Sequence, residues 1–204
     1  LLDTSPGGSG SVNGTSLPIS KNRIAKLLCF KNVTNHARDA LWQFDIPLQV
    51  ISCVLIVLTN ISRLCAELII WNSKEFNFIK IPDKFCRSSI IMPQKKNPYA
   101  LAYIRGFINS ISGSFSEYLN MGKELTGFPD SRIFIYSDLL NNLERSVLVI
   151  KLFTEIIENI EFNQASFEKV LKGSSSFATD LTDLLMLKLK LDYKTSYATV
   201  REYI

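Results

Sequence analysis

Residues 88–98, which read S-S-I-I-M-P-Q-K-K-N-P, are rich in side chains that bind anions. They offer hydroxyl, carboxamide and ammonium groups, in the order Ser88, Ser89, Gln94, Lys95, Lys96 and Asn97. Ammonium groups attract a carboxylate or phosphate, and hydroxyl and amide groups donate hydrogen bonds to it. The run is polar and contains two prolines, so it does not continue the long apolar segments on either side. We therefore expect a loop that meets an anionic ligand.

This run resembles the signature loop of the fumarase/aspartase superfamily, G-S-S-x-M-P-x-K-x-N-P, and M-P-Q-K-K-N-P resembles the argininosuccinate lyases in particular. The resemblance implies a β-elimination that cleaves a C–N bond of an N-succinyl substrate and releases fumarate, without a metal or cofactor. It implies that Ser89 removes the Cβ proton and that Lys95 and Asn97 hold a substrate carboxylate. Gln94 and Ser88 are further candidate substrate-binding residues of this signature loop, residues 85–99.

Each of these residues also has a structural interpretation. The Ser89 hydroxyl would bond its own backbone in a turn, and Lys95 and Asn97 would lie on a solvated loop surface. The resemblance favours function for these three. Lys96 is expected to be solvated, and Met92 to anchor the loop by packing.

The sequence departs from the family pattern in several places. Ser88 replaces the first glycine of the loop, Ile90 replaces a serine, and Ala102 stands where the family has a glutamate. The family's acidic histidine lies in a G-x-T-H-x-Q segment that this chain lacks. Tyr136, after the G-F-P turn at 127–129, is a candidate stand-in for a tyrosine that contacts substrate. The lone histidine, His36, is interpreted as a helix-entry residue rather than an acid.

Residues 6–11, P-G-G-S-G-S, suggest a second anion site in the form of a phosphate cradle. A simple glycine turn is favoured instead, because residues 1–17 are expected to be loop with no strand before the glycines. A similar P-x-G-S-G segment occurs in the argininosuccinate lyases, which supports the turn.

Apolar periodicity predicts an all-α fold. Long helices are expected over about 39–76, 98–123 and 131–160, with shorter ones over 20–30, 164–171 and from 178. Pro47 should kink the first long helix or mark its true start. In the third, residues 139, 143, 147, 150, 153 and 157 are expected to form the buried side. The break between the last two long helices is expected at 126–130.

The expected organisation is a central bundle segment over 1–160 and the start of a small C-terminal helical domain over 161–204. The resemblance implies that the N-terminal part of the family subunit is absent, and that bundle helices form a shared core in a homotetramer.

Composition limits the partners. The chain has 204 residues and a net charge of +4 with scattered basic residues, so no nucleic-acid stripe is expected. The apolar run at 46–58 is shorter than a bilayer span of roughly 20 residues, so a buried bundle helix is expected rather than a membrane anchor. Four cysteines without a ligand pattern favour reduced thiols in the cytoplasm. The expected partner is a small dicarboxylate; a non-catalytic scaffold and a sister lyase for another succinyl substrate remain alternatives.

Overall fold

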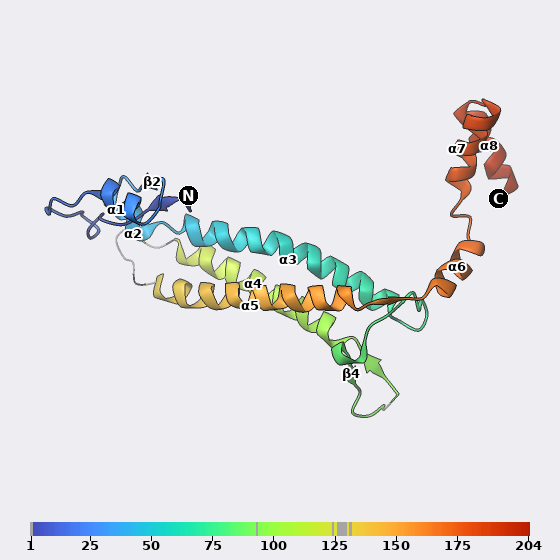
Figure 1. Cartoon of the computed structure of the whole chain (residues 1–204), viewed down its shortest axis with the longest axis horizontal. Helices are drawn as coiled ribbons and strands as arrows, with labels where there is room; N and C mark the ends of the chain where they lie inside the picture. The colour runs from blue at the N-terminus through green and yellow to red at the C-terminus, as the bar shows by residue number, and fades with distance from the viewer. Residues whose placement is uncertain (1, 93, 124, 126–129, 131) are drawn as a thin grey trace.

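Three long helices form an elongated bundle in the computed structural model, which describes residues 2–92, 94–123, 125, 130 and 132–204 (Figure 1). The bundle helices are α3 (Asp45–Trp71), α4 (Tyr99–Met121) and α5 (Arg132–Glu158). The short helices are α1 (Lys21–Leu27), α2 (Ala37–Trp42), α6 (Gln164–Lys172), α7 (Ala178–Leu189) and α8 (Tyr193–Tyr203). The strands are two residues each: β1 (Thr4–Ser5), β2 (Asn32–Val33), β3 (Ile79–Lys80), β4 (Arg87–Ser88), β5 (Lys96–Asn97) and β6 (Glu161–Phe162). The predicted all-α fold is confirmed.

The first long helix is shorter than predicted and begins at its proline. The segment predicted as one helix over 39–76 is instead α2, an extended residue at Gln43, and α3. Pro47 lies in the first turn of α3. A backbone N–H in the first turn has no acceptor within the helix, so a proline there costs no hydrogen bond. Of the two predicted roles, Pro47 therefore marks the helix start. The helix ends at Trp71, and the Asn72 side chain accepts a hydrogen bond from the Ile81 amide at 3.0 Å.

The core lies where α3, α4 and α5 meet. The fully buried aliphatic side chains include Ile51 and Leu58 from α3, Ile104 and Ile111 from α4, and Ile156 from α5. Residues three, four and seven apart share a helix face, which aligns these side chains toward one another. The predicted buried face of α4 is correct at residues 101, 104, 107, 108 and 111.

The predicted buried face of α5 is only partly correct, since Phe153 is buried and residues 139, 143 and 150 are half-buried. Val147 and Ile157 are exposed, whereas the buried positions are Ile135, Asn142, Ser146, Val149, Phe153 and Ile156. The true face contains two polar residues, which an apolar pattern passes over. Ser146 donates a hydrogen bond to the Asn142 carbonyl at 2.6 Å, so its hydroxyl needs no other partner.

A buried polar network explains the polar residues of that face. The Tyr118 hydroxyl, on α4, donates to Asp138 at 2.7 Å, and the Asn142 amide donates to both at 3.1 and 2.9 Å. Burial of Tyr118 raises the pKa of its hydroxyl well above the ordinary value, and the neighbouring Asp138 carboxylate adds to this shift as the second cause. The network joins α4 to α5 through satisfied hydrogen bonds, which fixes how the two helices align.

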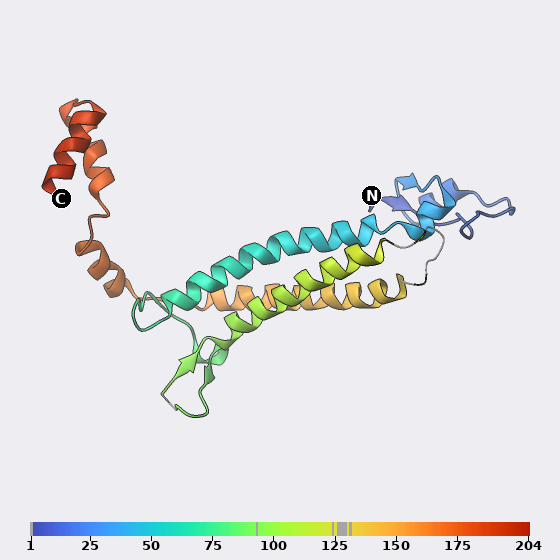
Figure 2. The same cartoon turned by 180° about the vertical axis from the view of Figure 1, so that it is seen from behind.

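Small pairings at one end of the bundle position the signature loop. Strand β3 pairs antiparallel with β6, which ties the chain before the loop to the chain after α5. Phe167 of α6 stacks on Phe78 with ring centroids 4.6 Å apart, and Trp71 packs edge-on against both. The 3-10 turn Asp83–Phe85 then leads into β4. Both views place the loop and α6–α8 at the end of the bundle opposite α1 and α2 (Figures 1 and 2).

Among the described residues, α3 is the one helix that is long and apolar enough to cross a membrane by length and composition. Core helices of soluble proteins satisfy the same two criteria. One face of α3 packs against α4 and α5, but only 22% of its most apolar window is buried. The prediction of a bundle helix therefore requires a further partner for its remaining apolar side chains.

Candidate active site at the signature loop

The signature loop is built on a short antiparallel hairpin. Strand β4 pairs with β5, with Arg87 opposite Asn97 and Ser88 opposite Lys96. The Ser89 amide donates to the Lys95 carbonyl at 3.0 Å, which continues the pairing beyond the strands. The Lys95 amide donates to the Met92 carbonyl at 2.9 Å and closes the turn. These hydrogen bonds hold together the described residues on the two sides of the loop.

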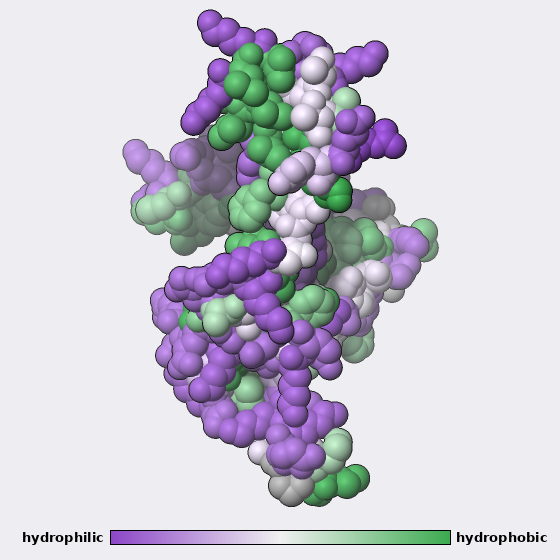
Figure 3. All heavy atoms as spheres, turned by 90° about the vertical axis from the view of Figure 1, so that its right-hand side faces the viewer, coloured by the Kyte–Doolittle hydropathy of each residue, from purple (hydrophilic) through white to green (hydrophobic). Residues whose placement is uncertain are grey.

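The tip of the hairpin projects from the bundle (Figure 1). Ile90 and Ile91 are 92% and 88% exposed, and Met92 is 41% exposed. Figure 3 shows apolar side chains gathered at the end of the hairpin, at the bottom of that view. Met92 therefore does not anchor the loop by burial within this chain. Adjacent exposed apolar side chains on a projecting loop indicate a surface that another element covers.

The Ser89 hydroxyl accepts two backbone hydrogen bonds, from the amides of Ile91 at 3.3 Å and Met92 at 3.1 Å. This is the turn geometry of the structural interpretation. The same geometry also suits a base, because N–H groups that donate to an oxygen favour its anionic form. An alkoxide at Ser89 would meet two donors already in place.

A pocket of about 480 Å³ lies between the loop and the end of α3. The loop contributes Met92, Gln94, Lys95, Lys96, Asn97 and Pro98, and the other wall contributes Ile69, Asn72, Ser73, Lys74 and Glu75. The structure thus brings together the predicted residues Gln94, Lys95 and Asn97. Sequence reasoning missed Asn72 and Lys74, since they follow a helix end and belong to no motif.

The two adjacent lysines have different electrostatic surroundings. The Lys96 ammonium pairs with the Asp83 carboxylate, and this hydrogen bond holds the pKa of Asp83 below its ordinary value. Lys96 is exposed, as predicted, and it also forms an ion pair at the surface that the sequence did not indicate. Within the described part of the chain, Lys95 forms no ion pair. Lys95 is the loop cation whose charge remains available for a ligand.

Other predicted residues do not line this pocket. Ser89 faces its own turn, and Ser88 lies on β4, opposite Lys96. Tyr136 lies in the first turns of α5 beside Arg132, and the loop lies at the far end of that helix. At 1.5 Å per residue, Tyr136 is roughly 33 Å from the end of α5. One copy of this chain therefore does not bring Tyr136 and Ser89 together.

Two further expectations concern residues outside the loop. His36 caps α2, with its Nδ1 atom accepting a hydrogen bond from the Arg38 amide at 3.2 Å, so its predicted role at a helix entry is confirmed. Ala102 lies on the first turn of α4 and supplies no carboxylate. The G-F-P turn at 127–129 lies outside the described residues.

Comparison with known proteins shows which family the chain belongs to. A family model described as a lyase matches residues 2–113. The argininosuccinate lyase of Thermoanaerobacter pseudethanolicus is 33% identical over 188 residues, covering 92% of this chain and 43% of that protein. The argininosuccinate lyase of Nitrosopumilus maritimus is 31% identical over 186 residues, covering 91% and 38%. The chain spans about two fifths of the length of these curated relatives.

Solved structures establish the fold independently. An EDDS lyase variant with bound fumarate superposes with a TM-score of 0.81 at 23% identity, covering 98% of this chain and 40% of that one. The class II fumarase of Schistosoma mansoni gives a TM-score of 0.75 at 19% identity, covering 98% and 50%. The chain therefore belongs to the lyase family of the fumarase/aspartase superfamily, and it resembles the argininosuccinate lyases over most of its length.

Proposed function

We propose that this chain forms part of a carbon–nitrogen lyase that cleaves an N-succinyl substrate by β-elimination and releases fumarate. The observation that supports it best is the pocket in which Lys95, Asn97 and Gln94 converge, next to a serine whose hydroxyl accepts two amide hydrogen bonds. The bound fumarate in the EDDS lyase variant is consistent with a dicarboxylate product in a protein of this fold.

The chemistry requires a fixed positive charge and a fixed donor. Removing a proton from the carbon beside a carboxylate places a second negative charge on that carboxylate. Lys95 supplies a point charge and Asn97 a neutral donor, and both are held by the hairpin before the charge develops. Ser89 then takes the proton as an alkoxide supported by the Ile91 and Met92 amides.

The rest of the site is proposed to come from two sources, other copies of the chain and the part of the relatives that this chain does not match. Tyr136 and Ser89 lie at opposite ends of one bundle, so an antiparallel neighbour would bring the tyrosine of one copy near the loop of another. We propose that the proton donor to the leaving nitrogen lies in the part of the relatives that this chain does not match. The exposed tip of the loop would then pack against a neighbouring subunit.

Uncovered apolar stripes support a homo-oligomer, proposed to be a tetramer. Ile133, Leu140 and Val147 on α5 recur every seven residues and are 71%, 65% and 51% exposed. Val57 and Leu64 form a matching pair on α3. A seven-residue repeat aligns such side chains along one helix face, which suits packing against another long helix.

A charge in the α5 stripe should break the assembly. Leu140→Glu would place a carboxylate against apolar side chains of the neighbouring subunit, where it has no partner, and should shift the sedimentation coefficient toward that of a monomer. Asn141→Glu is the matched control, because it adds the same charge at the next, exposed position off the stripe. A tetramer that survives Leu140→Glu, or a wild-type chain that sediments as a monomer, would refute this interface.

The substrate is proposed to be argininosuccinate, from the resemblance, in a cytoplasmic pathway of arginine synthesis. The test is to combine the chain with the part of an argininosuccinate lyase that it does not match, to incubate them with argininosuccinate and with other amino-succinates, and to follow fumarate by its ultraviolet absorbance. Release from argininosuccinate alone supports this substrate. Release from a different adduct alone assigns a sister lyase instead.

One observation favours a non-catalytic scaffold as the second candidate. Ala102 stands where the family has a glutamate. Among the described residues that line the pocket, Glu75 is the one with a carboxylate side chain. A scaffold keeps the oligomer and releases no fumarate from any amino-succinate, which separates it from both enzyme proposals.

A further inference from the structure

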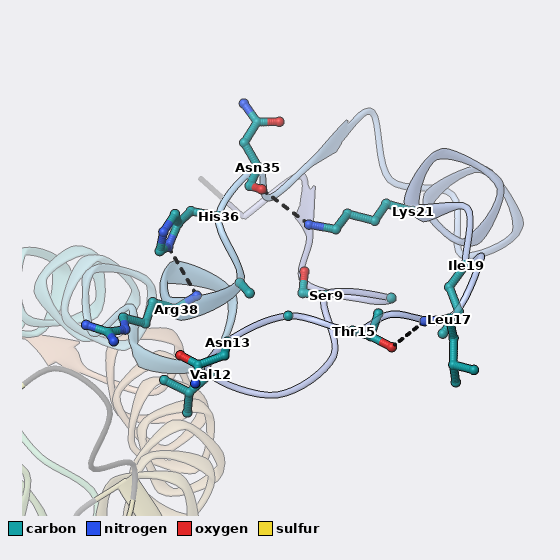
Figure 4. A pocket seen from close by; sticks show the side chains of 13 residues that line it. Ser9, Val12, Asn13, Thr15, Leu17, Ile19, Lys21, Asn35, His36 and Arg38 are labelled. Atoms are coloured by element: carbon teal, nitrogen blue, oxygen red, sulfur yellow. Dashed lines mark hydrogen bonds between the residues drawn. The ribbon is translucent and has the colours of Figure 1, made fainter.

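A second pocket lies at the other end of the bundle from the signature loop. It has a volume of about 580 Å³ and is enclosed by the glycine-rich segment and the chain that leads into α2 (Figure 4). Contrary to the prediction of loop throughout residues 1–17, strand β1 pairs with β2 directly before the glycines and fixes the start of this segment. No carboxylate is among the described residues that line the pocket, whereas Lys21, His36 and Arg38 all line it. The electrostatic environment therefore favours an anion.

Ser9 is a buried hydroxyl without a partner. Its side chain is 4% exposed, and its Oγ atom forms no hydrogen bond in the structure. Figure 4 shows this hydroxyl pointing into the open space of the pocket, on the side of Lys21. Buried polar groups are almost always hydrogen-bonded, so an orphaned hydroxyl directed into a pocket indicates a missing acceptor or donor.

Lys21 and His36 each have an N–H group that can donate a hydrogen bond to a ligand. The Lys21 ammonium donates to the carbonyls of Thr34 and Asn35, each at 3.3 Å, which leaves one of its three protons for a ligand. His36 accepts the Arg38 amide at Nδ1, so a neutral imidazole carries its proton on Nε2. Figure 4 shows the Ser9 hydroxyl and the Lys21 ammonium on the same side of the chain that leads into α2, whereas the His36 ring lies on its other side, beside Arg38.

Glycine geometry holds the loop in this shape. Gly10 has a φ of +74°, and a Cβ atom there would lie 2.6 Å from the Gly14 carbonyl oxygen. Ser11 and Gly14 pair through two backbone hydrogen bonds, at 3.2 and 2.8 Å. The turn that follows Ser9 is therefore held by its own backbone geometry and hydrogen bonds.

We propose that this pocket binds a phosphate group, either inorganic phosphate or a phosphate monoester, through Ser9 and Lys21, with His36 adding a further donor at the rim. A tetrahedral oxyanion presents acceptor oxygens in several directions, which suits donors that surround it. A carboxylate presents its oxygens in one plane and suits donors on one side. The site is separate from the signature loop and does not rest on the proposed lyase activity.

The test is calorimetric titration of the 204-residue chain with sodium phosphate, and separately with glycerol phosphate, at neutral pH and constant ionic strength. Saturable binding of one phosphate per chain is expected. Lys21→Gln should weaken it about tenfold or more, because one charge-assisted hydrogen bond is lost. Lys26→Gln removes the same charge from the same helix outside the pocket and should leave the affinity unchanged.

Ser9→Ala is a second variant, which tests the pocket without the risk that a loss of binding reflects unfolding. It should weaken phosphate binding several-fold while the melting temperature stays the same or rises, since the variant removes an unpaired buried hydroxyl. Tighter binding of glycerol phosphate than of inorganic phosphate assigns the site to a monoester, and the reverse assigns it to the free ion.

Four outcomes overturn the proposal. The first is the absence of saturable binding, and the second is equal affinity in the wild type, Lys21→Gln and Ser9→Ala. The third is phosphate binding that disappears in Lys95→Gln, which would place the anion in the signature pocket. Sodium acetate that binds as tightly as phosphate also contradicts it, because a planar carboxylate would then suffice.

Discussion

Ser89→Ala should reduce fumarate release by roughly a thousandfold while leaving the helical fold intact, since a positioned base contributes about two to four orders of magnitude. The alanine cannot accept the proton from the substrate. The change also leaves the Ile91 and Met92 amides without their acceptor, but these amides lie on exposed residues where water replaces it. Initial rates of fumarate formation measure the loss, and far-ultraviolet circular dichroism checks the fold.

Ser88→Ala is the matched control for this change. Ser88 lies one position earlier, on β4, and its pairing with Lys96 uses the backbone rather than the hydroxyl. Its variant should retain most of the activity, with an effect on the Michaelis constant if the hydroxyl touches substrate. Equal turnover by Ser89→Ala and the wild type would show that the base is another residue.

The sequence predicts the helices that position the site, but it does not always predict which face of a helix is buried. The apolar spacing of α4 identifies its buried side because that side is wholly apolar. In α5 the pattern indicates residues 147 and 157, which the structure leaves exposed. A helix in an oligomer has two apolar faces, one toward its own chain and one toward a neighbour, and spacing alone does not distinguish them.

Polar contacts between distant segments explain the other differences. Asn142 is buried on a face of α5 because its amide bonds the hydroxyl of Tyr118, which lies 24 residues earlier in the chain. The ion pair of Lys96 with Asp83 similarly joins the loop to the turn before it. Neither contact has a local signature, because each requires the fold to bring its partners together.

The site itself was predicted unevenly. The motif predicts that Lys95, Asn97 and Gln94 act together, and one pocket gathers all three. The motif also predicts that Ser89 acts with them, and the resemblance adds Tyr136, but the serine bonds its own turn and the tyrosine lies at the other end of the bundle. A motif records which residues meet in a complete assembly, and a single chain shows only the part that one copy builds.

Lys95→Gln should weaken fumarate binding about tenfold, by loss of one charge-assisted hydrogen bond to a carboxylate. The expected loss is at the low end of the range for such bonds because Lys95 is exposed and solvent screens its charge. The measurement is the dissociation constant of fumarate by isothermal titration at low salt.

Lys96→Gln is the comparison that makes this measurement decisive. Both variants remove one positive charge from adjacent positions of the same pocket, but the Lys96 ammonium is already neutralised by Asp83. We expect about tenfold weaker binding for Lys95→Gln and a change of less than about threefold for Lys96→Gln. Equal losses in the two variants, or no fumarate binding by the wild type, would contradict a carboxylate held at Lys95 and Asn97.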